Sequence, residues 1–443
     1  MGATLPGCIH ISRLDPAVTL EPWCGPSACA YKNFMFIVRI ASRLAPLVLF
    51  AGAASTQAQD FSLQGFADVR IVAAPDEASW SRGGLGKTRY GDGETTASFA
   101  AAALTARWQA TPALLLVADA RYQPHAGAAL SVTEAFARYR PVSTDAWRWS
   151  FKAGEFFAPI SLENDGIGWT SPWTLSSSAI DTWVGEELRT FGGELRVEHR
   201  GDADTLEAAV ALFGANDPAG EILSARGWAL GDVVSGVGSH LREPDTYTDL
   251  LGVPPPRRYD PFIEIDHRVG FYANVDWHSA QYGRVSATYY DNRADPSDYH
   301  TFNGDDELFA WRTKFSSLGA QTDIASLTVI AQAMSGSTEI FPPGFRSETH
   351  FAAAYVLAGW TLGAWRPALR FDAFTTRTDA PFPSQLDEHG NAWTFALNWR
   401  PLDWLRLTGE ALRVDSVRDQ RITVGLAPRQ IDTQIQINAR VFF

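Results

Sequence analysis

From residue 60 to the last residue, apolar and polar side chains alternate with a period of two. In the final stretch, QIQINARVFF, the apolar residues Ile435, Ile437, Ala439, Val441 and Phe443 alternate with polar ones. Successive side chains leave a β-strand on opposite faces, so alternation over about eight to twelve residues predicts a strand. No comparable helical period occurs after residue 59. The alternation therefore predicts an all-β chain.

About sixteen segments show this alternation. Their approximate bounds are 60–72, 95–109, 112–122, 130–140, 147–156, 188–199, 204–214, 267–277, 281–291, 307–316, 320–334, 348–360, 368–377, 391–400, 404–415 and 430–443. A tilted strand that crosses a membrane needs about 9–11 residues. Each segment is close to that length.

The connections between these segments alternate in length. Links after even-numbered segments are short, such as PVSTDA, SLGA and PLD, whereas most links after odd-numbered segments are long, such as 157–187 and 215–266. Short turns at one end and long loops at the other are typical of transmembrane β-barrels. We therefore predict a transmembrane antiparallel β-barrel with long extracellular loops, short periplasmic turns and both chain ends at the periplasmic side.

The alternative fold is a soluble all-β protein, such as a propeller or a long sandwich. That fold predicts polar outer faces and no asymmetry in loop length. Here Trp, Phe and Leu recur on one face of nearly every segment, and Arg, Asp and Glu lie on the other. A barrel of about sixteen strands is too wide for wall side chains to fill, so its polar interior stays wet. The pattern favours the barrel.

The start of the chain has a different character. The stretch from Met35 has two arginines, then a short apolar run from Leu44 to Ala54, then the small-residue site Thr56-Gln57-Ala58. This is the layout of a secretory signal peptide, which we place at 35–58, with the barrel at 59–443. We interpret residues 1–34 as a mis-called N-terminal extension. A genuine cytosolic or lipid-linked leader is the alternative.

Charge and cysteine content limit the partners. The chain has 37 basic against 50 acidic residues, a net charge of −13, which makes a nucleic-acid partner unlikely on electrostatic grounds. Its three cysteines, Cys8, Cys24 and Cys29, all precede Met35. The predicted mature chain therefore has neither disulfides nor thiol-ligated metals. We expect no cofactor and no metal.

At this point the chain resembles a bacterial outer-membrane porin, over the signal segment and the whole mature length. The ending NARVFF resembles the last strand of such barrels, and this resemblance makes Phe443 the signal for the barrel-assembly machinery. The stretch TEAFARYRPVSTDAWRWSFKAGEFFAPISLEN is similar to the porin O/P type. The phosphate-selective members of that type are rich in pore lysines, whereas this chain has only Lys87, Lys152 and Lys314 after residue 59, so phosphate selectivity is not carried over. The resemblance implies the bacterial outer membrane as location, contact with its lipid and lipopolysaccharide, and a homotrimer.

In sixteen-stranded porins the third external loop folds inward and narrows the pore, and the resemblance assigns that role to 157–187. The acidic residues of this predicted constriction loop are Glu163, Asp165, Asp181, Glu186 and Glu187. Alternation places these basic residues on the opposing pore wall: Arg138, Arg148, Lys152, Arg196, Arg268, Arg284, Arg370, Arg400 and Arg440. Acid on the loop and base on the wall would produce a transverse field that sets solute and ion preference. Alternatively, these charges pair simply to hold strands and loops.

Two further features have alternative interpretations. Trp169, Trp173 and Trp183 could form an apolar track for sugars or pack the loop against the wall, and the long loop 215–266 could be a lid or a subunit contact. GxSxG, HExxH and Gly-rich phosphate motifs are absent from the sequence, so we expect no enzyme. We predict a water-filled channel for passive diffusion of small hydrophilic solutes. The alternative is an outer-membrane barrel for adhesion or surface recognition, or a barrel enzyme.

Overall fold

The computed structural model describes residues 60–124, 130–244, 257–301, 307–344, 346–381 and 387–443. The extension predicted at 1–34 and the signal peptide predicted at 35–58 lie outside these residues. Among the described residues, no helix combines the length and the hydropathy needed to cross a membrane.

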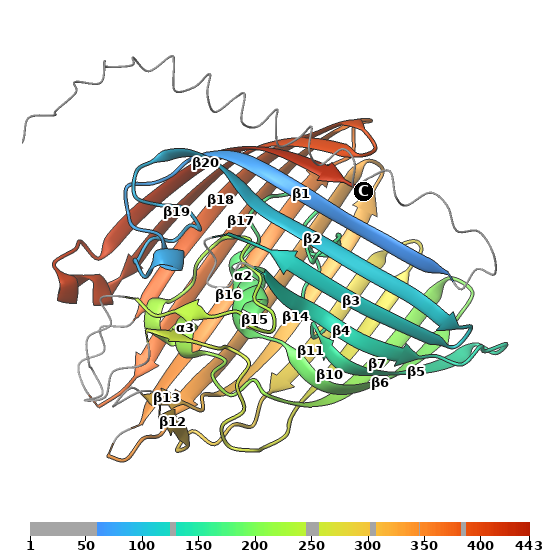
Figure 1. Ribbon diagram of the computed structural model, residues 1–443, viewed down its shortest axis with the longest axis horizontal. Helices are drawn as coiled ribbons and strands as arrows, with labels where there is room; N and C mark the ends of the chain where they lie inside the picture. The colour runs from blue at the N-terminus through green and yellow to red at the C-terminus, as the bar shows by residue number, and fades with distance from the viewer. Residues whose placement is uncertain (1–59, 125–129, 245–256, 302–306, 345, 382–386) are drawn as a thin grey trace, which may run out of the picture. The chain divides into compact units, whose positions relative to one another are not determined.

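Sixteen strands of the described chain form one closed antiparallel barrel, in which neighbours in sequence are neighbours in space (Figure 1). In order around the ring they are β1 (Phe61–Ala73), β2 (Thr95–Thr111), β3 (Leu114–Tyr122), β4 (Leu130–Tyr139), β5 (Trp147–Phe156), β6 (Thr190–Arg200), β7 (Asp204–Gly214), β10 (Gly270–Ser279), β11 (Gly283–Asp291), β14 (Arg312–Ile324), β15 (Leu327–Ile340), β16 (Ser347–Trp360), β17 (Trp365–Asp379), β18 (Glu388–Leu402), β19 (Leu405–Arg418) and β20 (Arg429–Phe442). Pairing of β1 with β20, in which Asp68 lies opposite Arg440, closes the ring. The predicted fold class is confirmed.

The remaining elements lie in the long connections. They are the 3-10 helices η2 (Trp80–Arg82) and η3 (Asp419–Val424), the helices α2 (Ala179–Glu187) and α3 (Glu221–Arg226), and the short strands β8 (Leu241–Arg242), β9 (Arg258–Tyr259), β12 (Tyr299–Thr301) and β13 (Glu307–Phe309). β8 pairs with β9, and β12 pairs with β13. These hairpins are separate from the barrel sheet.

The alternation decides which face of each strand points inward. In β20, Ile437 is 62% exposed, whereas its neighbour Asn438 is 1% exposed, and the same contrast runs along the strand. The apolar residues of β20 therefore lie on the outer surface of the barrel, and its polar residues face the lumen. This is the reverse of a soluble protein, in which the apolar face would be the buried one. Other strands also present buried aromatic residues inward, such as Phe315 and Phe351.

The predicted segments at 307–316 and 320–334 are wrong in position. The residues Ser317–Ala320, predicted as a turn, lie inside β14, and the chain turns instead at Ala325, which has a φ of 55°. Residues 307–309 belong to the β12–β13 hairpin. The small residues of SLGA suggested a turn, but Gly319 faces the lumen, where it lies against Leu162 and leaves no space for a side chain.

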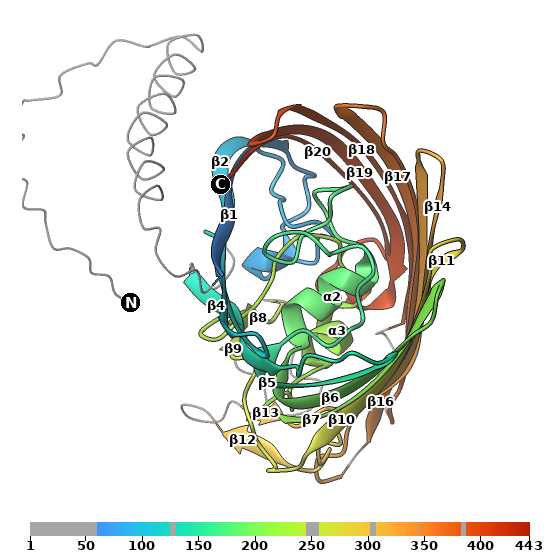
Figure 2. The same ribbon diagram turned by 90° about the vertical axis from the view of Figure 1, so that its right-hand side faces the viewer.

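The lengths of the connections differ between the two ends of the barrel. At one end the links are short, such as 325–326 and 403–404, and we call it the short-turn end. At the other end two long connections fold into the lumen, and Figure 2 shows α2 and α3 inside the ring of strands. We call residues 157–189 the first inner loop and residues 215–244 the second inner loop. The inward fold of the second was not predicted.

Candidate functional site: the loop-filled lumen

The first inner loop crosses the lumen and contacts the wall on several sides. Side chains of several wall strands donate hydrogen bonds to its main-chain oxygens, including two from Arg370 of β17 to Ser176 and Ser177. Four others come from different strands. These are Thr288 of β11 to Pro159 at 3.1 Å, Gln332 of β15 to Ile160 at 2.9 Å, Arg121 of β3 to Gly168 at 2.6 Å and Asn398 of β18 to Trp173 at 2.7 Å. Strands far apart around the ring thus hold one loop.

An ion-pair cluster fixes the start of α2. Glu163 accepts a hydrogen bond from the Ser178 N–H at 2.6 Å and pairs with Arg370 of β17 at 3.1 Å. Arg370 also donates to Asp372 at 2.8 Å, and Asp372 accepts from the Ala179 N–H at 3.1 Å. Helix N-termini have unpaired N–H groups and favour negative charge. The wall carboxylate therefore helps to cap α2.

Asp181 lies beside this cluster in a fully buried position. Burial raises the pKa of Asp181 well above its usual range, and the neighbouring Glu163 carboxyl raises it further. Two buried carboxyl groups side by side disfavour the charged form of Asp181, which is the physical cause of this shift.

Aromatic packing holds the middle of α2. The Trp183 ring is 2% exposed, and its centre lies 5.1 Å from that of Phe351 of β16 and 5.6 Å from that of Phe315 of β14. Trp228 of the second inner loop lies 6.0 Å from it. Trp173 is also buried, against Gly359. For Trp173 and Trp183 the geometry therefore favours packing of the loop against the wall, rather than an apolar track for sugars.

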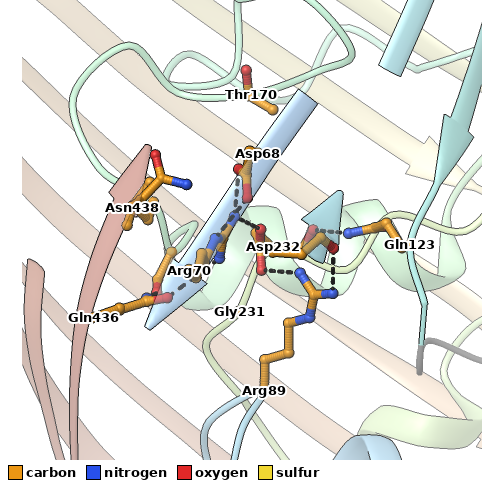
Figure 3. Close-up of polar contacts among 12 residues, drawn as sticks. Asp68, Arg70, Arg89, Gln123, Thr170, Gly231, Asp232, Gln436 and Asn438 are labelled. Carbon is orange, nitrogen blue, oxygen red and sulfur yellow. Dashed lines mark hydrogen bonds and ion pairs between the residues drawn. The ribbon is translucent and has the colours of Figure 1, made fainter. Parts of the chain in front are cut away.

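The second inner loop is anchored at Asp232 (Figure 3). Its carboxylate accepts hydrogen bonds from Arg70 of β1 at 2.6 Å and from Arg89 at 2.9 Å. Its main-chain oxygen accepts from Arg121 and Gln123, both at 2.9 Å. Burial alone would raise the pKa of Asp232, but the charges of Arg70 and Arg89 outweigh it and hold the pKa well below the usual range. Asp232 is therefore ionised and shared between a strand and two loops.

The part of the second inner loop around the end of α3 is held by β18 and β19. Glu388 pairs with Lys87 and accepts from the Trp228 N–H at 2.9 Å, and Arg418 donates to the main-chain oxygens of Ser224 and Ala225, each at 2.9 Å. The two inner loops also contact each other, because Arg226 pairs with Glu186 of α2. The loops and the wall thus form one connected polar network.

Buried carboxyls occupy the space between α2 and α3. Glu187 caps the start of α3, since it accepts from the Gly220 N–H at 3.2 Å and the Ile222 N–H at 3.0 Å. Burial raises the pKa of Glu186 to about 7, despite the Arg226 charge that lowers it. Burial also raises the pKa of Glu221 to about 8, despite its hydrogen bond from the Trp311 ring N–H. These groups titrate near neutral pH, at the junction of the two inner loops.

The predicted constriction acids are mostly buried. Glu163, Asp181, Glu186 and Glu187 are each 0% exposed and sit in contacts of the inner loops. Only Asp165 of this set is exposed. Asp165 is thus the one predicted acid in a position to meet solutes directly, whereas the other four act in holding the loops.

The predicted basic wall residues fall into four groups. Arg370 and Arg440 are buried in ion pairs, the latter with Asp68 at 2.7 Å. Lys152, Arg196, Arg284 and Arg148 lie near the carboxylates of other wall residues, at distances between 2.6 and 4.0 Å. Arg138 is half-buried on the inner face of β4, and Arg400 is exposed near the short-turn end of β18. Arg268 precedes β10, is exposed and pairs with Asp295, so it is not a wall residue.

Sequence reasoning missed the anchor of the second inner loop. Arg70 and Arg121 alternate inward on their strands, but nothing in the sequence pairs them with Asp232, 162 and 111 residues away. One signal was present. The stretch AGEILSARGWALGDVVSGVG is rich in small and apolar residues, which is unusual for an exposed loop. Such a composition is better suited to a segment buried in a lumen.

A group of three carboxylates at Asp217, Glu264 and Asp266 has oxygens within 4.8 Å of one another, a spacing that could hold a metal ion. Burial, together with the nearby carboxylates of Asp266 and Glu264, raises the pKa of Asp217 to about 7. However, Asp217 accepts from the N–H groups of Ile265 and Asp266, and Glu264 accepts from that of Ala215. These hydrogen bonds give the three carboxylates a structural role, because they join the two ends of the connection between β7 and β10.

Two histidines lie beside groups that could in principle assist catalysis: His240 follows Ser239, and His350 lies near an acid. His350 is exposed on the outer face of β16, 3.4 Å from Asp379. The Ser239 hydroxyl accepts from the Gly236 N–H, and His240 beside it is exposed. These contacts of Ser239 and His350 do not join a serine, a histidine and a carboxylate into a triad.

Comparison with known proteins supports the fold. No protein-family model and no curated protein sequence matches the chain. Among solved structures, the outer membrane channel DcaP of Acinetobacter baumannii superimposes with a TM-score of 0.51 at 13% identity, over 88% of this chain and 100% of that chain. The anion-selective porin from Comamonas acidovorans gives 0.48 at 10% identity, over 87% and 99%, and Salmonella typhi OmpF gives 0.47 at 12%, over 86% and 97%.

Identities this low establish the fold alone. The closed ring of sixteen strands, the polar inner face and the match to DcaP define the chain as a porin-like outer-membrane β-barrel. Within that class it has two inner loops that cross the lumen and are tied to each other through Arg226 and Glu186. The fold points to the outer membrane as its location.

Proposed function

We propose that the protein is an outer-membrane channel for passive diffusion of small hydrophilic solutes. The observation that carries the proposal is the polar, charged inner face of a closed sixteen-strand barrel. A ring of this size is wider than wall side chains can fill. Its interior is therefore suited to water and polar solutes wherever the inner loops leave space.

The inner loops determine the path that a solute follows. They are fastened to the wall at several places by hydrogen bonds and ion pairs, including those of Arg370, Asp232 and Glu388. Such anchors keep the loops in one position more firmly than a single hinge would. A solute must therefore pass beside the loops, and we expect a channel narrower than an unobstructed barrel of the same strand number.

The charges along this path that are not fully buried supply the solute preference. Asp165 on the first inner loop faces a lumen whose wall contains Arg138, Arg284 and Arg400. This is a reduced form of the transverse field predicted from the sequence, since the other four loop acids are buried. We propose that polar and dipolar solutes pass more readily than apolar ones.

The test is a liposome-swelling assay with the purified full chain and neutral sugars of increasing size. We expect fast swelling with the smallest sugars and a steep decline with size, because the inner loops narrow the path. An adhesion protein or a barrel enzyme would give no solute flux in this assay. Absence of swelling with every sugar, from protein that has folded and inserted, would exclude the channel.

The partners implied by the resemblance to porins belong to the same proposal. In the outer membrane the apolar outer face contacts lipid and lipopolysaccharide, and the barrel-assembly machinery inserts the chain. The homotrimer also remains a prediction. Light scattering on detergent-purified protein distinguishes three copies from one.

A further inference from the structure

Three arginines come together on the lumen wall near the short-turn end of β18, β19 and β20. Arg406 and Arg440 are direct cross-strand partners in the β19–β20 ladder. The guanidinium carbons of Arg400 and Arg406 lie 5.4 and 5.6 Å from the centre of the Phe442 ring. Like charges directly opposite each other on neighbouring strands are destabilising. This arrangement therefore needs negative charge nearby.

The three arginines differ in the acceptors that lie near them. Arg440 pairs with Asp68 at 2.7 Å, and Arg400 donates to the main-chain oxygen of Asp403 at 2.7 Å. Arg406 is only 8% exposed, yet its Nε and one of its Nη groups have no hydrogen-bond acceptor among the described residues. A buried cation without acceptors is costly, and buried polar groups are normally satisfied.

The nearby carboxylates are already engaged by other arginines. Asp68 also accepts two hydrogen bonds from Arg70, at 3.0 and 3.1 Å. Asp232, further along the lumen, is shared by Arg70 and Arg89. Positive charge therefore exceeds negative charge along this side of the wall, and the excess is greatest at Arg406.

We propose that Arg406, with Arg400 and Arg440 beside it, binds a small oxyanion such as a carboxylate- or phosphate-bearing solute at the short-turn mouth of the lumen. A guanidinium group presents several N–H donors in a planar fork that matches such oxygens. The unpaired Nε and Nη of Arg406 are the donors that the oxyanion satisfies. The Phe442 ring forms an apolar side of the site. The binding site itself does not depend on the proposed function. Only the idea that the ligand is a transported solute rests on it.

The test is calorimetric titration of inorganic phosphate, and separately of acetate, into the folded full chain in detergent at low ionic strength. We expect saturable binding that Arg406→Gln weakens about tenfold or more, the loss typical of a charge-assisted hydrogen bond. Arg413→Gln is the matched control. Arg413 lies on the same strand, but it is exposed on the outer face and bonds to Thr433. The control should bind like the original protein.

Thermal unfolding separates binding from a structural role. Without added anion, Arg406→Gln should be at least as stable as the original protein, because it removes an unpaired buried cation. Phosphate should raise the unfolding temperature of the original protein and of Arg413→Gln, but not that of Arg406→Gln. A variant that is less stable without anion, or equal phosphate binding by all three proteins, would overturn the site.

The test of the oxyanion site can also be distinguished from the test of the channel. Saturable phosphate binding without solute flux would keep the oxyanion site and exclude the channel. Solute flux without saturable binding of phosphate or acetate would keep the channel and overturn the oxyanion site.

Discussion

Buried charges hold the lumen together. Asp232 is the clearest case, because one carboxylate joins Arg70 of the wall to Arg89 of the first long connection, while its main-chain oxygen accepts from Arg121. Removing one partner from a buried ion pair is costly, since the remaining charge stays buried without compensation. The second inner loop is therefore expected to be most sensitive at this residue.

Asp232→Asn should lower the free energy of unfolding by roughly 3–5 kcal/mol, because the buried Arg70 and Arg89 lose the carboxylate that they share. Urea titration of the refolded barrel, followed by tryptophan fluorescence, measures the change. Asp92→Asn is the control, since Asp92 pairs with Arg82 at a site where the arginine side chain is 55% exposed. Such surface pairs contribute about 0–1 kcal/mol. Equal losses in the two variants would contradict the assigned anchor.

Glu221 provides a pH prediction. Its pKa is raised from 4.5 to about 8 in the folded protein, mainly by burial. Between these two values the unfolded chain is ionised while the folded chain keeps its proton, so this residue makes stability fall as pH rises from 4.5 to 8. Below 4.5 both states are protonated, and the effect vanishes.

Glu221→Gln should therefore match the original protein at pH 4 and exceed its stability at pH 9. One pKa unit corresponds to about 1.4 kcal/mol, so we expect a gain on the order of 1 kcal/mol or more. Glutamine can still accept the hydrogen bond from the Trp311 ring. Thermal unfolding at both pH values measures the gain, with the exposed Glu94→Gln as control. A gain that does not depend on pH would contradict the buried, protonated carboxyl.

At the scale of elements, the first inner loop separates into a held part and a free part. Its helix α2 is capped by Ser178, clamped through Glu163 and Arg370, and packed at Trp183 against β14 and β16. Asp165 lies outside these contacts and is exposed. Acids only two residues apart in sequence should thus have different roles.

Asp165→Asn should shift the ion selectivity of the channel toward anions with little change in stability, because it removes an exposed lumen charge. Glu163→Gln should instead destabilise the loop, because Arg370 loses a buried partner. Reversal potentials in a salt gradient, together with thermal unfolding, measure both effects. If Glu163→Gln shifts selectivity and Asp165→Asn does not, the division of the loop is wrong.

At the scale of the whole molecule, the strands were largely predictable from the sequence and the contents of the lumen were not. Alternation such as that of Ile437 and Asn438 is local, and it fixes which face of a strand meets lipid. The pairing of Asp232 with Arg70 depends on how a loop of many residues folds back, which no local pattern encodes. The position of β14 was missed because small residues in SLGA resemble a turn but serve close packing against Leu162.

The end of the chain provides a prediction about assembly. The Phe443 N–H and C=O exchange hydrogen bonds with Gly65 of β1, and its ring covers the space where a Gly65 side chain would lie. Deletion of Phe443 removes this last contact of the closing strands. We expect a lower yield of folded barrel in the outer membrane, measured by the heat-modifiable band on gels. Unchanged yield would contradict a role in assembly.

We propose that a polar lumen, narrowed by two anchored inner loops, conducts small solutes. Single-channel recording of the full chain in planar bilayers tests it most directly, with Asp232→Asn beside the original protein. We predict discrete, ohmic steps for the original protein, and larger or longer-lived steps for the variant, because its second inner loop has lost its main anchor. No conductance from either inserted protein would contradict the account.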